Sequence, residues 1–244
     1  LDPVTEESFS GGENQCLPHI SFSTMNKIEQ FIAWYNGLLE GLEHLDGSHR
    51  IAALKGKNLE DTLNRVYSFL SNELELQNNV LFFPAAAEDT LFARRGTPED
   101  KVVLARSILR MLGIESYYAL VPKKGISKQT GYISPSQFSH VLLYIPVSMD
   151  KNSWFDFSNS YYSCGVVSSQ AAGSTALIIM KKAYDWKEVN ETIHTFLENK
   201  FTVTIDDSGA GTIALTTIFH GRNGAMRELF IDEEDRDETV SLYM

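Results

Sequence analysis

Hydrophobic residues in the first half of the chain recur at the spacing of α-helices. From Ile28 onwards, apolar side chains fall three or four positions apart, which predicts a helix that continues to Leu45. A second helix is predicted to begin after Asn58, a residue type that caps helices well, with its apolar positions continuing to Leu74. A third, shorter helix is predicted over residues 86–95. The first half of the chain is therefore expected to be helical.

The segment that follows Gly96 carries the strongest helix-start signal in the sequence. Thr97 can cap a helix, and Pro98 suits the first helical position because its backbone has no N–H to leave unbonded. Acidic Asp100 in the first turn favours the positive end of the helix dipole. Apolar positions continue at helical spacing to Gly113, where glycine commonly ends a helix. The sequence predicts a helix from Pro98 to about Gly113.

Beyond Gly113 the pattern changes to short runs rich in β-branched and aromatic residues. Strands are predicted over residues 116–121, 140–146, 153–157, 175–180, 192–196, 201–205 and 212–219, with shorter candidates at 20–22 and 80–83. Residues 206–209 are the predicted turn of the last hairpin, and residues 224–244 look helical and acidic. Because helices come first and antiparallel-looking strands follow, the predicted fold class is α+β.

These changes of pattern divide the chain into three expected parts. Residues 1–57 are an irregular lead-in with a linker helix, residues 58–185 a mixed core, and residues 186–244 a β-rich domain that is cut short. The chain opens on Leu1 rather than Met, so we expect it to be a segment of a longer protein.

Composition and charge exclude several classes of function. The net charge is −11 and no cluster of Lys or Arg offsets it, which disfavours binding to nucleic acid. No apolar run approaches the roughly 20 residues of a membrane-spanning helix. Cys16 and Cys164 are too few for a disulfide framework or a zinc site. The acidic run 232–238 lacks the spacing of a calcium loop, and a solvated helix face is the better interpretation. We expect neither a metal nor a cofactor.

Three segments occur in an order that suits acyl transfer by a cysteine. They are the helix that begins after Gly96, the strand that starts at His140, and the strand that ends at Asp156. In such enzymes a thiolate at a helix N-terminus is stabilised by the helix dipole, a His acts as its base, and an Asp or Asn orients that His.

The residues of these segments resemble the core of the bacterial transglutaminase-like family, which is related to papain. That family reads Gly-Asp-Cys-Lys-Asp-Lys, then an apolar helix ending in Leu-Gly-Ile, then Phe-x-His-Val and Trp-x-Asp-Pro. The matching residues here are Gly96, Asp100, Lys101, Leu112-Gly113-Ile114, His140-Val141 and Trp154-Phe155-Asp156. The resemblance covers about residues 58–182. It implies a papain-type fold, a Cys–His–Asp site, and a place in a large exported protein with β-domains on either side of the core.

This sequence departs from the family at the nucleophile, because the position of the cysteine falls on Pro98. His140 and Asp156 are then remnants of a triad, and we expect them on adjacent antiparallel strands, roughly 3 Å apart. The resemblance and the departure together predict an inactive relative that binds or scaffolds in an extracytoplasmic protein. Its expected partner is a protein or peptide, with a glycan as the alternative. The rival interpretation is an active cysteine-type hydrolase, protease or acyl-transfer enzyme, which needs a nucleophile from elsewhere, such as Cys164.

Each of these residues also has a structural interpretation. His140 can be an ordinary strand histidine, and Asp156 can lie at a strand end in water, although its apolar neighbours favour a partner such as His140. Cys164 is more often a small buried residue than a displaced nucleophile. The aromatic group after His140 could stack on a sugar or peptide, but packing is the better explanation. That group is Trp154, Phe155, Phe157, Tyr161 and Tyr162.

Overall fold

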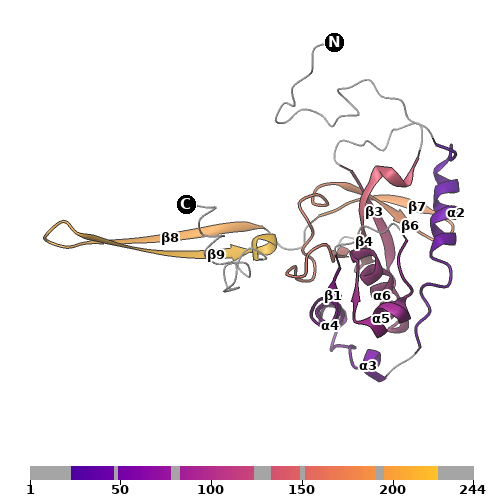
Figure 1. Ribbon diagram of the computed structural model, residues 1–244, viewed down its shortest axis with the longest axis horizontal. Coiled ribbons are helices and arrows are strands. Elements are labelled where there is room, and N and C mark those ends of the chain that lie inside the picture. Colours follow the sequence, from indigo (N-terminus) through magenta and orange to yellow (C-terminus); the bar gives the residue numbers. More distant parts are fainter. Residues whose placement is uncertain are drawn as a thin grey trace, which may run out of the picture.

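The structure is a computed structural model, and it describes residues 23–46, 49–77, 83–123, 133–148, 152–190 and 195–224. Helices occupy the first part of the described chain and an antiparallel sheet follows them (Figure 1), which confirms the predicted α+β class. The predicted strands 20–22 and 80–83, except Phe83, and the predicted helical tail beyond Gly224 lie outside the described residues.

The helices are α2 (Ile28–Leu38), α3 (His49–Ala52), α4 (Leu59–Asn72), α5 (Ala87–Ala93) and α6 (Pro98–Met111). The start of α4 is as predicted, because the Asn58 side chain accepts a hydrogen bond from the Asp61 N–H at 2.8 Å. The helix predicted to reach Leu45 instead ends at Leu38. Gly41 explains the difference, since its φ of +81° lies in the left-handed region and cannot continue a right-handed helix.

The central sheet has the strand order β5-β4-β3-β6-β7, and every neighbouring pair is antiparallel. Its strands are β3 (Tyr117–Pro122), β4 (Phe138–Pro146), β5 (Asn152–Phe155), β6 (Thr175–Ile179) and β7 (Tyr184–Glu188). A short parallel pair, β1 (Glu75–Leu76) with β2 (Arg95–Gly96), connects the end of α4 to the start of α6.

Strand β4 is buried on both of its faces, which explains its continuous apolar sequence. Val141, Leu143 and Ile145 belong to the large core that the helices share with the sheet. Leu142 and Tyr144 alternate with them and pack into a smaller core on the other face. Helix α6 packs against β4 as well as against α4 and α5, so it is enclosed by the rest of the domain.

The N-terminus of α6 is closed by a capping box. The Asp100 N–H donates to Thr97 Oγ1 at 3.2 Å, and the Thr97 N–H donates back to Asp100 Oδ2 at 2.8 Å. The other oxygen of Asp100 accepts the Ala85 N–H at 2.6 Å. Pro98 is the first helical residue, as predicted. A Cβ on Gly96 would lie 2.9 Å from Cβ of Asp100, so a glycine is needed to let the two segments approach.

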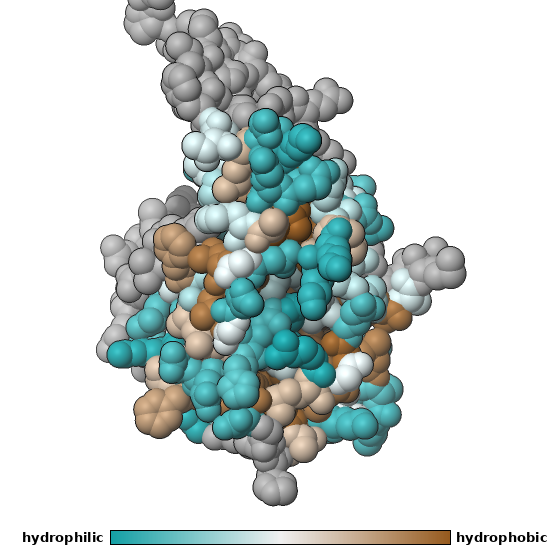
Figure 2. Space-filling view, turned by 90° about the vertical axis from the view of Figure 1, so that its right-hand side faces the viewer, coloured by the Kyte–Doolittle hydropathy of each residue, from teal (hydrophilic) through white to brown (hydrophobic). Residues whose placement is uncertain are grey.

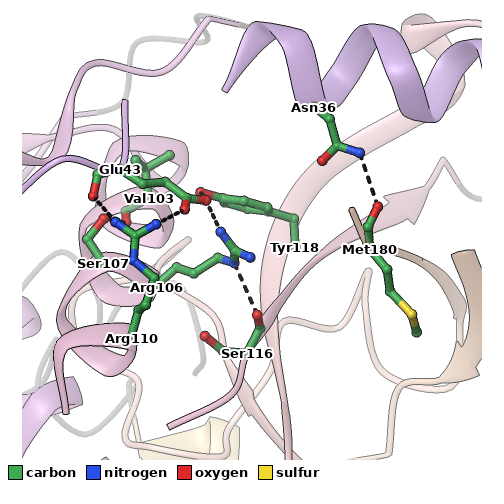
Figure 3. Close-up of polar contacts among 9 residues, drawn as sticks. All are labelled: Asn36, Glu43, Val103, Arg106, Ser107, Arg110, Ser116, Tyr118 and Met180. Atoms are coloured by element: carbon green, nitrogen blue, oxygen red, sulfur yellow. Dashed lines mark hydrogen bonds and ion pairs between the residues drawn. The ribbon is translucent and has the colours of Figure 1, made fainter. Parts of the chain in front are cut away.

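The linker helix α2 packs on the domain rather than standing apart from it. Its residues Phe31, Ile32 and Tyr35 are buried in the large core. Asn36 donates to the carbonyl of Met180 at 3.1 Å, which ties the helix to the end of β6 (Figure 3). On the face of the molecule turned towards α2, hydrophobic residues occur in small groups between hydrophilic ones (Figure 2).

A second attachment holds the segment after α2 against α6 and β3. Glu43 accepts hydrogen bonds from Arg106, from Arg110 at 2.8 Å and from the Tyr118 hydroxyl at 2.7 Å (Figure 3). The guanidinium of Arg106 also lies over the Tyr118 ring, 4.9 Å from its centre. Because the Glu43 side chain is only 15% exposed, this carboxylate needs both cations as partners.

The C-terminal part of the described chain is a long hairpin. Strands β8 (Phe196–Ile205) and β9 (Gly211–His220) pair along their whole length, and η2 (Gly221–Asn223) follows. The strand predicted at 201–205 is the end of β8, and of the strand predicted at 192–196 only Phe196 belongs to β8. Thr195 precedes the strand, and residues 192–194 lie outside the described residues. The predicted turn is present, with Asp206 Oδ1 accepting the N–H groups of Ser208 and Ala210. Strand β7 crosses the predicted boundary between residues 185 and 186, because it pairs with β6 in the central sheet.

Within the part of the chain that the structure describes, no helix has the length and apolar character that crossing a membrane requires.

The capping box predicts which changes at the start of α6 lower stability. We expect Thr97→Ala to reduce the free energy of unfolding by about 1 kcal/mol, because the Asp100 N–H loses its acceptor inside the protein. Pro98→Ala should cost little, since proline makes no hydrogen bond there. Urea denaturation measures both changes, and Thr97→Ser is the matched control that keeps the hydroxyl. Equal losses in Thr97→Ser and Thr97→Ala would contradict the assignment of the effect to the cap.

Candidate functional site

The structure brings His140 and Asp156 together. His140 lies near the start of β4, and Asp156 directly follows β5, the antiparallel neighbour of β4. Nε2 of His140 is 3.9 Å from Oδ2 of Asp156, which is longer than the hydrogen-bond distance expected from the sequence. Both side chains are shielded from solvent, at 11% and 1% exposed.

The Asp156 carboxylate is held mainly by the backbone. Oδ1 accepts the N–H of Ser158 at 2.8 Å, and Oδ2 accepts the N–H of Ser168 at 2.7 Å. The backbone carbonyl of Asp156 accepts the hydroxyl of Tyr67 at 2.6 Å. The residue is fully buried, so the alternative of an aspartate at a strand end in water is wrong. Two amide donors thus satisfy one oxygen each of this carboxylate in a site that excludes water.

His140 contacts hydroxyl groups at both ring nitrogens. Nδ1 lies 3.0 Å from Oγ of Ser139, and Nε2 lies 3.4 Å from Oγ of Ser168. Burial lowers the pKa of His140, and the nearby Asp156 charge opposes that shift only in part. The imidazole is therefore neutral at pH 7, and its approach to Asp156 is a contact between a neutral ring and a carboxylate. We infer that the carboxylate favours the tautomer with the proton on Nε2.

Ser168 is the member of this site that the sequence did not reveal. It contacts both His140 and Asp156, and its hydroxyl also accepts the Ala171 N–H at 3.3 Å. Serine is common in turns, and nothing in its immediate sequence distinguishes it. The sequence could have pointed to Ser168 only indirectly. A buried Asp156 requires hydrogen-bond donors, and the loop that follows it must supply them.

Pro98 begins α6, and α6 packs against the strand that carries His140. Its ring has no atom that can attack a carbonyl or accept a proton. Next to it, burial raises the pKa of Glu99. Lys101 is buried one turn further along the helix, where its Nζ donates to the carbonyl of Leu74 at 2.7 Å and burial lowers its pKa to about 8.

Cys164 lacks the surroundings of a reactive thiol. Its side chain is half-buried against the large core, and burial raises its pKa to about 12. At neutral pH the thiolate is therefore a negligible fraction, whereas a nucleophilic cysteine has a lowered pKa. Cys16 lies outside the described residues.

Aromatic residues around Asp156 form part of the core. The centre of the Tyr67 ring lies 5.0 Å from that of Phe157 and 5.2 Å from that of Phe155. On the other face of the sheet, the ring centres of Trp154 and Tyr144 are 5.0 Å apart. Tyr162 is partly buried against the same core, whereas Tyr161 is exposed. Packing, rather than ligand stacking, accounts for most of this group. Among the described residues, no cluster of His, Cys, Asp and Glu could hold a metal ion.

Comparison with known families agrees with the arrangement of these residues. The sequence profile of the transglutaminase-like superfamily matches residues 48–158, a segment that contains Pro98, His140 and Asp156. The chain therefore contains a transglutaminase-like domain, and the resemblance inferred from its motifs is confirmed.

Among solved structures, the chain is similar to the crystal structure of a candidate protease from Parabacteroides distasonis. The TM-score is 0.46 and the sequence identity 11%, over 85% of this chain and 57% of that protein. This chain thus spans little more than half the length of that protein. A comparison with proteins of curated function finds no match.

The balance of burial and charge at His140 predicts its response to pH. We expect Asp156→Asn to lower the pKa of His140 further, because the carboxylate is what partly offsets burial. In the wild-type protein the pKa already lies below the usual value of about 6.5. The unfolded chain therefore takes up a proton first, and stability present above about pH 6.5 is lost as the pH falls through the lower pKa of the folded state.

An NMR titration of the His140 ring C–H protons measures this pKa directly. Asp185→Asn, which removes an exposed carboxylate on β7, is the matched control and should leave the pKa unchanged. A rise in the His140 pKa in Asp156→Asn would contradict the proposed balance. Ser168→Ala provides a second measurement that retains the carboxylate, should Asp156→Asn fail to fold.

Proposed function

We propose that this transglutaminase-like domain is catalytically inactive and serves as a binding or scaffolding module of a larger, exported bacterial protein. The observation that carries the proposal is Pro98, which occupies the first position of α6, where the family resemblance places the nucleophilic cysteine. The side chain of proline has no nucleophilic atom and therefore cannot form an acyl-enzyme intermediate. The same residue serves the helix well, because position N1 needs no backbone N–H.

Cys164, the cysteine within the described residues, does not replace the missing nucleophile. Cys164 has a raised pKa, and the residues that influence it are Ser153 and Glu60 rather than His140. A nucleophile needs its base within hydrogen-bond reach. The proposal therefore treats His140 and Asp156 as the remains of a site that has lost its first member.

The expected ligand of such a module is a protein or peptide, with a glycan as the alternative. The net charge of −11 disfavours nucleic acid. Large exposed aromatic side chains, which often anchor polypeptide partners, are present on the described surface. They include Phe83, Phe92, Tyr161, Phe196 and Phe201, and Phe92 on α5 is the most exposed at 91%.

The proposal predicts that acyl-transfer chemistry is absent and can be partly restored. Wild-type protein should show only background peptide hydrolysis and background crosslinking of glutamine to lysine. Pro98→Cys should acquire one thiol that reacts with iodoacetamide faster than Cys164, because a helix N-terminus lowers the pKa of a thiol. Pro98→Cys combined with His140→Ala separates the contribution of the imidazole from that of the helix. Wild-type turnover that disappears in His140→Ala would show that the domain is an enzyme.

A second candidate function, hydrolysis with a serine nucleophile, has one observation in its favour. The exposed Ser139 places Oγ 3.0 Å from Nδ1 of His140, while Asp156 lies on the Nε2 side of the same ring. Hydroxyl, imidazole and carboxylate follow one another as in a serine hydrolase, but the two ring nitrogens have exchanged roles relative to the Ser-His-Asp triad. However, Ser139 Oγ is also placed to donate to the carbonyl of Val121, at 3.2 Å, which would leave its proton unavailable to His140.

A fluorophosphonate probe, which labels activated serines, decides between the two candidates. We expect no labelling of the wild-type protein, because the Ser139 proton is directed to Val121. Ser139→Ala tests the residue itself, and Ser136→Ala removes another serine just before β4 as a control. Labelling that is lost in Ser139→Ala and kept in Ser136→Ala would replace the inactive module with a serine hydrolase.

A further inference from the structure

Residues 40–46, which we call the strap, run from the end of α2 towards α3 and contain no helix or strand. The Leu42 carbonyl accepts the N–H of Ala87, the first residue of α5, at 2.8 Å, and Glu43 is bonded to α6 and β3. At Gly41, the φ of +81° turns the chain out of the helical direction. The strap therefore lies across the junction of α5, α6 and β3.

The chain on both sides of the strap is fixed by apolar burial. Phe31 in α2 is fully buried, Leu39 directly before the strap is 5% exposed, and Ile51 in α3 is 2% exposed. Within the strap, Leu42 and Leu45 are only partly buried against the same core. Polar contacts therefore contribute more to holding the strap than to holding its neighbours.

Most of these polar contacts converge on one carboxylate. The Glu43 side chain accepts hydrogen bonds from Arg106, from Arg110 at 2.8 Å and from the Tyr118 hydroxyl at 2.7 Å (Figure 3). Arg110 also donates to the backbone carbonyl of Glu43 at 2.6 Å. Because α6 and β3 both bond the same side chain, loss of this carboxylate removes the side-chain bonds to both elements at once.

The surface that receives Glu43 is held in place by other contacts. Arg106 Nε donates to the carbonyl of Ser116 at 3.1 Å, and its guanidinium lies over the ring of Tyr118. Tyr118 also packs against Tyr35 of α2, with ring centres 6.1 Å apart. None of these contacts involves the strap. The surface therefore keeps its shape when the strap leaves, and the strap can return to it.

The ionic character of this attachment makes it sensitive to the solvent. Taking carboxylate and guanidinium groups out of water offsets much of their mutual attraction, so such a cluster often holds a segment no more firmly than apolar packing of the same volume. The side chains of Glu43 and Arg106 remain 15% and 25% exposed, and that of Arg110 57%. Dissolved salt therefore reaches the cluster and screens its attraction.

We propose that the strap is a releasable latch, which opens and closes as a unit while the rest of the domain stays folded. The ion pairs of Glu43 with Arg106 and Arg110 set how often it opens, so the open fraction rises with ionic strength. In the open state the first N–H of α5 loses its acceptor, and Arg106 and Tyr118 face solvent. This device goes beyond the proposed function, which depends on residues outside the strap and its contacts.

Hydrogen exchange at low urea concentrations tests the proposal in the full chain. The Ala87 amide reports opening of the strap, because its proton is bonded to Leu42. Amides that pair β3 with β4 report unfolding of the domain, and the Thr90 amide, bonded to the Ala86 carbonyl at 3.0 Å, reports opening of α5. We expect exchange at Ala87 to be at least about tenfold faster than at both, and to depend little on urea, since opening a short segment exposes little surface.

A change of charge at Glu43 gives the second measurement. Glu43→Gln keeps the shape of the side chain and should accelerate exchange at Ala87 by about tenfold, because bonds to a charged acceptor are the stronger ones. Glu40→Gln removes an exposed carboxylate from the same strap and is the matched control. Raising NaCl from about 0.05 M to about 0.5 M should accelerate exchange at Ala87 more in the wild type than in Glu43→Gln. Should Glu43→Gln fail to fold, Arg110→Gln removes one of the two cations and is expected to have the same effect.

Three results would overturn the proposal. Exchange at Ala87 with the rate and urea dependence of β3 and β4 would mean that the strap leaves only when the domain unfolds. Equal rates at Ala87 and Thr90 would mean that α5 opens instead. Equal effects of Glu43→Gln and Glu40→Gln, or of salt on the wild type and on Glu43→Gln, would mean that the ion pairs do not control the opening.

Discussion

Enclosure of helix α6 is the constraint on which the arrangement of this domain depends. The helix lies between α4, α5 and β4, so its free N–H groups cannot rely on water. Within the chain, Thr97 accepts the N–H of Asp100 and Asp100 accepts the N–H of Thr97, and the second oxygen of Asp100 accepts the N–H of Ala85. The start of α6 therefore helps to position the sheet, the neighbouring helices and the loop before α5.

That helix start is also where the family resemblance places a cysteine. A catalytic thiolate and a first turn that stabilises the fold would compete for the same position. A thiolate there would draw on the positive end of the helix dipole. Here Glu99 and Asp100 occupy the first turn, and carboxylates at that position already complement the dipole. Buried Lys101 holds the connection between α4 and β1 rather than facing the helix end. The first turn of α6 is thus arranged to secure the fold.

Sequence reasoning succeeded where the signals are local. Thr97, Pro98 and Asp100 lie within one turn, so their pattern predicted the start of α6. The end of α2 was predicted wrongly, because apolar residues can keep helical spacing after the backbone has stopped being helical. Leu39, Leu42 and Leu45 continue the apolar period of α2 because they pack into the core, although the chain around Gly41 has left the helix.

Contacts between distant segments could not be predicted in the same way. The carboxylate of Glu43 meets Arg106 and Tyr118 only through the fold, and no local pattern pairs them. Ser168 enters the candidate site for the same reason. The order of the family motifs did place His140 near Asp156, because neighbouring antiparallel strands follow each other in the chain. It could not give the distance, which depends on how the loop from Asp156 to Ser168 folds.

Asp156 and His140 differ in how much each contributes to the stability of the fold. Without its carboxylate, Asp156 would leave the buried N–H groups of Ser158 and Ser168 unsatisfied, at a cost of about 1–3 kcal/mol each. Stability therefore explains Asp156 without any reaction. The hydrogen-bond contacts of His140 are with hydroxyl groups, and the Asp156 carboxylate lies 3.9 Å from its ring. Burial opposes protonation of His140, so this residue destabilises the fold at low pH and contributes no comparable support. The function of this site consequently depends on what His140 does, more than on any other residue in it.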